Sequence, residues 1–95
     1  MLGDTFFGGP EITSGTDFVD IPIGISYYGN PHTASDAPTN IVQNIDYDQC
    51  IIIKRGGSPE MNRGFMVVIN KWGIAVKFKG VNWDANWKYL VTLSQ

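Results

Sequence analysis

The alternation of apolar and polar residues is most regular in the last third of the chain, from Phe65 to Leu93. An apolar run covers residues 65–69, a break follows at Asn70-Lys71-Trp72-Gly73, and a second β-rich run covers residues 74–79. Two such runs joined by a short turn that ends in Gly are typical of a β-hairpin. We therefore predict that this hairpin is central to the fold.

The second run of the hairpin has the pattern of a half-buried strand. Ile74, Val76 and Phe78 share one face, and Lys77 and Lys79 share the other, because successive side chains of a strand point to opposite faces. The simplest interpretation is that the lysine face is solvated and the apolar face packs on the core.

Other segments also have strand character. Residues 25–28 and 41–45 are expected to be short strands, and the apolar run at 89–93 is expected to close the domain. Residues 50–55 form a β-branched run typical of a central strand buried on both faces. Apolar residues do not recur at helical spacing over three turns, and the best candidate for a single helical turn is at 84–87. The sequence thus predicts a mainly β fold, a small antiparallel β-sheet or sandwich with a central hairpin and at most one short helical turn.

The chain is expected to contain one domain. Residues 1–15 are Gly-rich and irregular, which indicates an arm or connector, and residues 16–95 form a single β-rich domain. Phe6 and Phe7 lie on this arm and need an apolar partner. Docking on the core of the same domain and docking on a neighbouring copy are both consistent with the sequence. We expect the chain to be a piece of a longer protein.

Composition and charge narrow the range of functions. Charged residues make up 17% of the chain, below the ~25% of an ordinary domain, and a sparsely charged surface often meets another surface. The net charge of −2 gives no electrostatic footprint for nucleic acid. Apolar runs stay shorter than the ~18 residues of a membrane span. We therefore expect neither nucleic-acid binding nor membrane insertion.

Catalytic and metal-binding chemistry is not indicated. His32 lies in a polar loop without a nucleophile motif nearby, and the single cysteine, Cys50, precedes an isoleucine run that favours a buried thiol. Asp46 and Asp48 would share a strand face, but nothing marks them as a glycosidase pair, and their spacing is unlike that of a recognised calcium loop. We predict no catalytic residues, no metal site and no cofactor, and hence not an enzyme.

The aromatic residues are the best binding candidates. Stacking on a sugar ring needs an exposed aromatic face with polar side chains beside it. Two sets of residues fit this description: Trp72 with Asn70 and Lys71 at the hairpin turn, and Trp83 with Asn82 and Asp84. Burial in the core or in a subunit interface is the competing interpretation for Trp83, and Trp87 is expected to be core. Trp72 is the residue most expected to face a ligand, because a turn tip is seldom core.

Several short sequence motifs, here called phrases, follow one another in an order that resembles the knob-like domains of phage tail fibres and pyocin fibres. The phrases are Gly15-Thr16-Asp17, then residues 21–28, then Ala34-Ser35-Asp36-Ala37-Pro38-Thr39-Asn40, and finally Trp83-Asp84-Ala85-Asn86-Trp87-Lys88-Tyr89-Leu90. The resemblance covers roughly residues 15–93. It departs at Asp36, where Asn is commoner, at the spacing of Trp83 and Trp87, and at residues 44–49.

The resemblance implies a homotrimeric module of a viral adhesion fibre, located in the virion and extracellular when it functions. Its partners would be a host cell-surface glycan or other virion tail proteins. Two hypotheses follow, a domain for host-surface attachment and a purely structural spacer or assembly module of the tail or baseplate. A glycan-active enzyme domain is a third alternative with less support.

Overall fold

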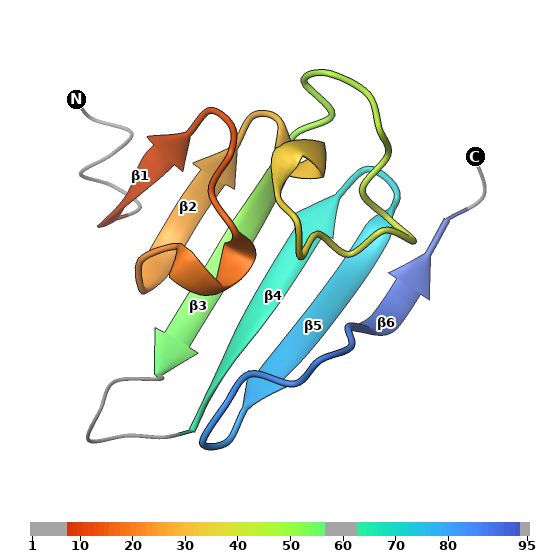
Figure 1. The fold of residues 1–95 in the computed structure, drawn as a ribbon. Coiled ribbons are helices and arrows are strands. Elements are labelled where there is room, and N and C mark those ends of the chain that lie inside the picture. Colours follow the sequence, from red (N-terminus) through yellow and green to blue (C-terminus); the bar gives the residue numbers. More distant parts are fainter. Residues whose placement is uncertain (1–7, 57–62, 94–95) are drawn as a thin grey trace.

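Six strands form one sheet whose spatial order follows the sequence, β1-β2-β3-β4-β5-β6 (Figure 1). The computed structural model describes residues 8–56 and 63–93. The strands are β1 Gly8–Ile12, β2 Gly24–Tyr28, β3 Cys50–Gly56, β4 Gly64–Asn70, β5 Gly73–Lys79 and β6 Lys88–Thr92, and two 3-10 helices are η1 Phe18–Asp20 and η2 Pro31–Thr33. The predicted mainly β class is confirmed.

The edge strand β1 is the one departure from an antiparallel sheet among the described strands. It pairs in parallel with β2, whereas the pairs from β2 to β6 are antiparallel. The chain leaves β1, crosses one face of the sheet through η1, and enters β2 in the same direction (Figure 1). Residues 8–12 of the predicted arm therefore belong to the sheet. Phe6 and Phe7 lie outside the described residues, and their docking stays a prediction.

The predicted hairpin is present as β4 and β5. Asn70 pairs with Gly73 across the turn, and the Asn70 Oδ1 atom accepts the backbone N–H groups of Trp72 at 2.8 Å and Gly73 at 3.2 Å. An Asn side chain that bonds to the backbone two residues on is a common way to build a turn. A Cβ atom at Gly73 would lie 2.1 Å from the Val91 carbonyl oxygen, so the close approach of β6 requires glycine there.

Two local predictions were wrong. Residues 41–45 are a turn and loop segment, in which the backbone N–H groups of Ile41 and Val42 bond to the Pro38 carbonyl. Both side chains are buried, so tertiary packing, and not strand pairing, satisfies their apolar character. The helical turn expected at residues 84–87 is absent, because Trp83 instead forms an isolated bridge with Lys79. The described helical turns are η1 and η2.

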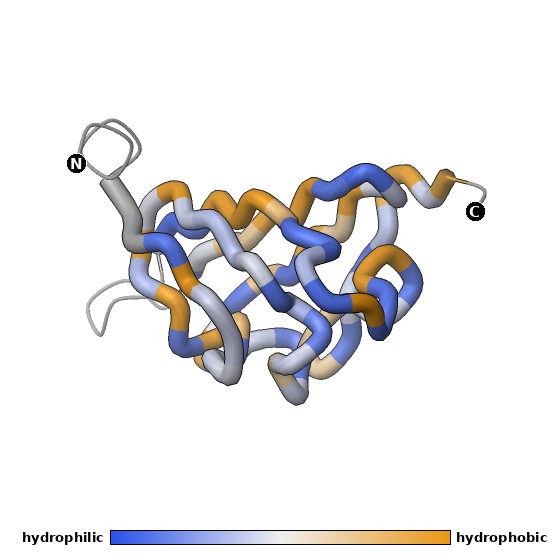
Figure 2. The backbone as a smooth tube through the Cα atoms, turned by 90° about the horizontal axis from the view of Figure 1, so that it is seen from above, coloured by the Kyte–Doolittle hydropathy of each residue, from blue (hydrophilic) through white to orange (hydrophobic). Residues whose placement is uncertain are grey.

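Irregular segments cover one face of the sheet and form the core with it. Residues 13–49, except β2, and the segment before β6 lie on this side (Figures 1 and 2). Phe18 from η1 stacks on Tyr28 with ring centroids 5.3 Å apart and meets Trp87 edge-on at 5.6 Å. The core cluster comprises Ile12, Phe18, Ile21, Tyr28, Ala34, Ile41, Val42, Cys50, Ile52, Met66, Val68 and Ala75. We call this side the covered face.

The opposite side of the sheet carries a second set of apolar side chains. These side chains alternate along each strand with the buried ones, and the register between strands places them on the same side of the sheet. They are Ile25, Tyr27, Ile51, Ile53, Phe65, Val67, Ile69, Ile74, Val76, Phe78 and Val91. Within residues 8–56 and 63–93, no segment lies over them, and in Figure 2 the sheet runs along one side of the molecule. We call this surface the open face.

The two faces of β5 are therefore the reverse of the prediction. Lys77 is only 5% exposed and lies on the covered face, where its Nζ atom stands 4.7 Å from the centre of the Trp87 ring. Phe78, expected in the core, is 47% exposed on the open face. A lysine can occupy the covered face because the aromatic ring attracts its ammonium group and its long stem is apolar.

Candidate functional site

Two carboxylates fasten the covering segments to each other. The carboxylate of Asp36 accepts the backbone N–H groups of Phe18 at 2.7 Å and Val19 at 3.2 Å. Asp17 Oδ1 accepts the N–H and the hydroxyl of Ser35, both at 2.9 Å. Each carboxylate thus holds the other's segment, and we call this pair of contacts the aspartate seam. These side chains are committed to structure and give no catalytic pair.

A buried lysine completes the same region. The Nζ atom of Lys54 donates to the carbonyl oxygens of Val19 at 2.7 Å and Ile21 at 2.6 Å, and more weakly to that of Phe18 at 3.3 Å. Burial lowers the pKa of Lys54, and the negative charges of Asp20 and Asp36 oppose this shift. Through its three hydrogen bonds, the ammonium group satisfies the carbonyl groups at the end of η1. Sequence reasoning missed this role, because Lys54 follows an isoleucine run and gave no local signal.

The candidate set at the hairpin turn is brought together but largely engaged by the protein. The Trp72 indole N–H donates to Asp48 Oδ2 at 2.9 Å, and the Lys71 ammonium lies 4.8 Å from the ring centre. The side-chain amide of Asn70 donates to the Ile41 carbonyl at 2.8 Å. Half-buried Trp72 also packs against the core cluster. These contacts attach the turn to residues 41–48, and a ligand would have only the remaining ring surface.

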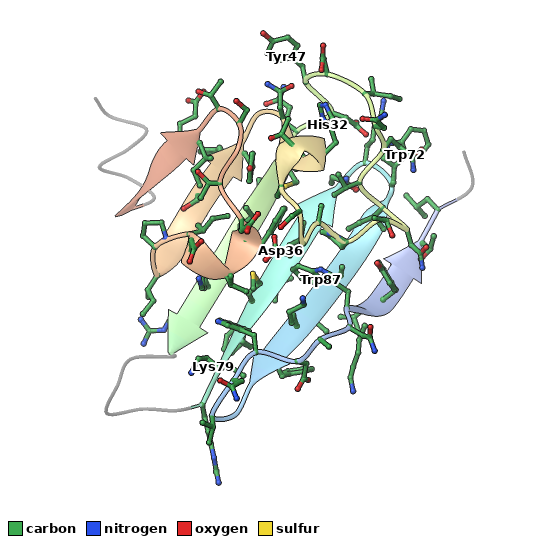
Figure 3. All side chains as sticks on the ribbon, viewed as in Figure 1. His32, Asp36, Tyr47, Trp72, Lys79 and Trp87 are labelled. Carbon is green, nitrogen blue, oxygen red and sulfur yellow. The ribbon has the colours of Figure 1, made fainter. Side chains whose placement is uncertain are left out.

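The second candidate set lies at the other end of β5. Trp83 is half-buried and packs against the core cluster. The centre of its ring lies 5.3 Å from the Lys54 Nζ atom. Asn82 and Asp84 are exposed. Trp72 and Lys79 mark the two ends of β5 in Figure 3, and Trp83 pairs with Lys79. Since a strand of this length spans roughly 20 Å, the two candidate sets form separate surfaces.

Within residues 8–56 and 63–93, the groups that could act as nucleophile, acid or base are engaged in structural contacts or lie apart. The His32 side chain is only 14% exposed, and its Nε2 atom lies 3.3 Å from Oδ1 of the exposed Asp46. Burial, and secondarily the charge of Asp48, raises the pKa of the Cys50 thiol from 9.0 to about 12, so the thiol stays protonated at neutral pH. The predicted core position of Cys50 is confirmed by its 3% exposure. In the described part of the chain, His, Cys, Asp and Glu side chains do not gather in groups of three or more that could hold a metal ion.

The sequence patterns did not predict the open face. One shallow hollow near the end of β3 is lined by Arg55, Phe65 and Phe78 among others. A second hollow at the opposite end includes Tyr27, Ile51 and Ile69. The signal was present in the continuous apolar run of β3, which predicted burial on both faces. Its second face is the one that lacks a cover within the described residues.

Comparison of the chain with protein-family models, with curated proteins and with solved structures gave no match. The described residues contain no helix long and apolar enough to cross a membrane.

Proposed function

We propose that this domain is a non-enzymatic protein-interaction module that works by packing its open face against a protein surface. The observation that carries the proposal is the open face itself, an apolar sheet surface with Ile51, Phe65 and Phe78 between 37% and 47% exposed. Domains bury the apolar side of a sheet against a second layer. Large contiguous apolar patches on soluble domains mark interaction sites.

The size of the hydrophobic effect and the shallow shape of the open face favour a protein partner over a small molecule. Removing apolar surface from water is worth roughly 25 cal/mol per Å², so a flat apolar face gains most from a partner of matching extent. The hollows on this face are shallow and lined mainly by apolar residues. A small-molecule site would need concavity and a few converging polar groups.

We place this module in a phage-type tail fibre or a related contractile-tail device, acting in assembly of the fibre. Support comes from the phrases of the resemblance. Asp17 from the first phrase and Asp36 from the Ala34–Asn40 phrase form the aspartate seam. The Trp87 indole N–H from the closing phrase donates to the Asp36 carbonyl at 2.7 Å. Residues that carry the resemblance thus meet at one structural centre, although they are far apart in the sequence.

Thiol protection tests the interaction function. In an Ile69→Cys variant, a maleimide reagent reports access to the open face, and the wild-type chain, whose Cys50 is buried, serves as the control. We expect the introduced thiol to react quickly in dilute protein and to become protected in assembled material. Equal reactivity at every concentration, alone and with purified tail proteins present, would remove the basis of the proposal.

Host-surface attachment is the second candidate function, and the loop between β5 and β6 favours it. Asn82, Asp84 and Asn86 are exposed there, and a polar hollow is lined by Asp84, Ala85, Asn86 and Lys88. Carbohydrate recognition needs such amide and carboxylate groups. A glycan array or a cell-envelope binding assay tests it. Binding that is lost in Asn82→Ala and Asp84→Ala, and kept in Trp72→Ala, would assign attachment to this loop. No binding by the wild-type chain would reject the function.

A further inference from the structure

We propose that the partner of the open face is a second copy of this chain, packed face to face about a two-fold axis that runs along the strands. This inference rests on the proposed interaction function and names the partner, and it replaces the homotrimer that the resemblance implies with a two-fold pair. It accounts for two features that alternation alone leaves unexplained. β3 is apolar on both faces, and the register places Ile74, Val76 and Phe78 of β5 on the open face, where Phe78 is 47% and Val76 7% exposed.

The strand register arranges the open face in rows that run across the sheet. Ile25, Ile53, Val67, Val76 and Lys88 form a central row through the pairings of β2 to β6. The neighbouring rows are Tyr27, Ile51, Ile69, Ile74 and Val91 on one side, and Arg55, Phe65 and Phe78 on the other. Paired residues share a face and a level along the strands.

A two-fold axis between β3 and β4 brings matching rows together. Rotation about this axis keeps the level along the strands and exchanges β3 with β4, β2 with β5 and β1 with β6. Ile53 of one copy then lies over Val67 of the other. Arg55 lies over Phe65, and a guanidinium group over an aromatic ring is a favourable pair. Each contact occurs twice, as in any two-fold interface.

The charges on the open face select this axis. Of the charged residues in the described strands, alternation and register direct Glu11, Arg55 and Lys88 to this face. Glu11 lies on the β1 edge and Lys88 on the β6 edge. Exchange of β1 with β6 brings Glu11 to within one row of Lys88, a step of roughly 7 Å that a lysine side chain spans. An axis perpendicular to the strands would instead bring each edge over its own copy and set like charges together.

The area fits a specific dimer. Six strands about 4.8 Å apart, each with five to seven residues, cover a projected area of roughly 24 by 20 Å. Because side chains project unevenly from the sheet, the accessible area is larger than this projected area and approaches the ~800 Å² per partner of a standard interface. Two sheets in face-to-face contact, about 10 Å apart, are the arrangement of a β-sandwich.

Solution mass of the 95-residue chain, by light scattering or sedimentation, tests the inference. We expect a dimer at high concentration. Val67→Lys sets a lysine at the centre of the interface and should weaken dimerisation at least about 100-fold. Its folded state tolerates the change because Val67 faces away from the core. Asn44→Lys, in an exposed loop, is the matched control and should leave the mass unchanged.

Charge exchange tests the axis. Glu11→Lys and Lys88→Glu should each weaken the dimer several-fold at low salt, on the order of 3- to 10-fold, and the double variant should recover wild-type affinity. A double variant that dimerises no more tightly than the single variants overturns the strand-parallel axis. A solution mass of three copies also overturns it. A monomer whose Ile69→Cys thiol is protected only by other tail proteins overturns self-pairing and leaves the proposed function standing. A monomer with a protected thiol shows that the same chain covers the face, which overturns both.

Discussion

The Asp36 carboxylate lies 2.7 Å from the backbone nitrogen of Phe18 and fixes the aromatic centre of the covered face. The Phe18 ring, fully buried, contacts both Tyr28 and Trp87. The Asp36 carbonyl accepts the Trp87 indole N–H at 2.7 Å (Figure 3). One residue therefore connects the η1 segment, the loop after η2 and the approach to β6.

Loss of the Asp36 carboxylate should destabilise the fold. Asp36→Ala leaves the N–H groups of Phe18 and Val19 without their acceptors, which costs about 2–3 kcal/mol of unfolding free energy. Asp36→Asn keeps one acceptor oxygen and should cost less. Urea denaturation measures both. Asp84→Ala, at an exposed position, is the control and should change stability by less than about 0.5 kcal/mol. An Asp36→Ala variant as stable as this control would contradict the role of the seam.

Gly73 and Gly80 form a matched pair for testing the approach of β6 to β5. A Cβ atom at Gly73 would meet the Val91 carbonyl oxygen at 2.1 Å, whereas a Cβ atom at Gly80 has nothing within 4 Å. Gly73→Ala should lower the unfolding free energy by about 2–4 kcal/mol. Gly80→Ala should be neutral or slightly stabilising, by up to about 1 kcal/mol. Thermal unfolding of the two variants measures the difference, and equal melting temperatures would contradict the observed pairing.

The Lys54 ammonium should be necessary for the geometry of η1. Lys54→Met removes the donor that bonds to the carbonyls of Val19 and Ile21, and unpaired buried carbonyls cost about 1–3 kcal/mol in total. Hydrogen exchange should show faster exchange at the Ile21 amide, which bonds to the Phe18 carbonyl. Lys79→Met is the control, because the Lys79 ammonium donates to an exposed carbonyl, that of Val81. Equal effects of the two substitutions would argue against this role.

The Cys50 thiol should make stability fall at alkaline pH. Burial raises the pKa of the thiol from 9.0 to about 12 in the folded chain. Its contribution is therefore fully present below pH 9.0 and is lost as pH rises towards 12, because only the unfolded thiol ionises in that interval. The slope is at most about 1.4 kcal/mol per pH unit.

Comparison with Cys50→Ala isolates this titration from the other groups that ionise at high pH. The stability difference between the two proteins should be constant below pH 9 and should shrink above it. The native thiol should also resist maleimide and react after unfolding in urea. Rapid labelling of native protein at neutral pH would contradict the buried thiol.

Local sequence patterns were enough to predict much of the fold. The hairpin, the strands at β2 and β3 and the buried Cys50 followed from alternation and turn residues, which act over a few neighbouring positions. The loop at residues 41–45 did not, because Ile41 and Val42 have strand-like character but are buried by contacts with distant segments. Of the candidate site, the grouping of Trp72 with Asn70 and Lys71 was foreseen. Its engagement by Asp48 depends on a loop far away in the sequence.

By itself, the sequence determined that the chain is mainly β and where most of its strands and its central turn lie, because side-chain alternation and turn chemistry are local properties. Only the tertiary structure decided which side of each strand is covered. Alternation separates two faces but does not say which one faces the core, and irregular covering segments have no periodic pattern. That is why Lys77 lies under Trp87 while Phe78 points to the open face.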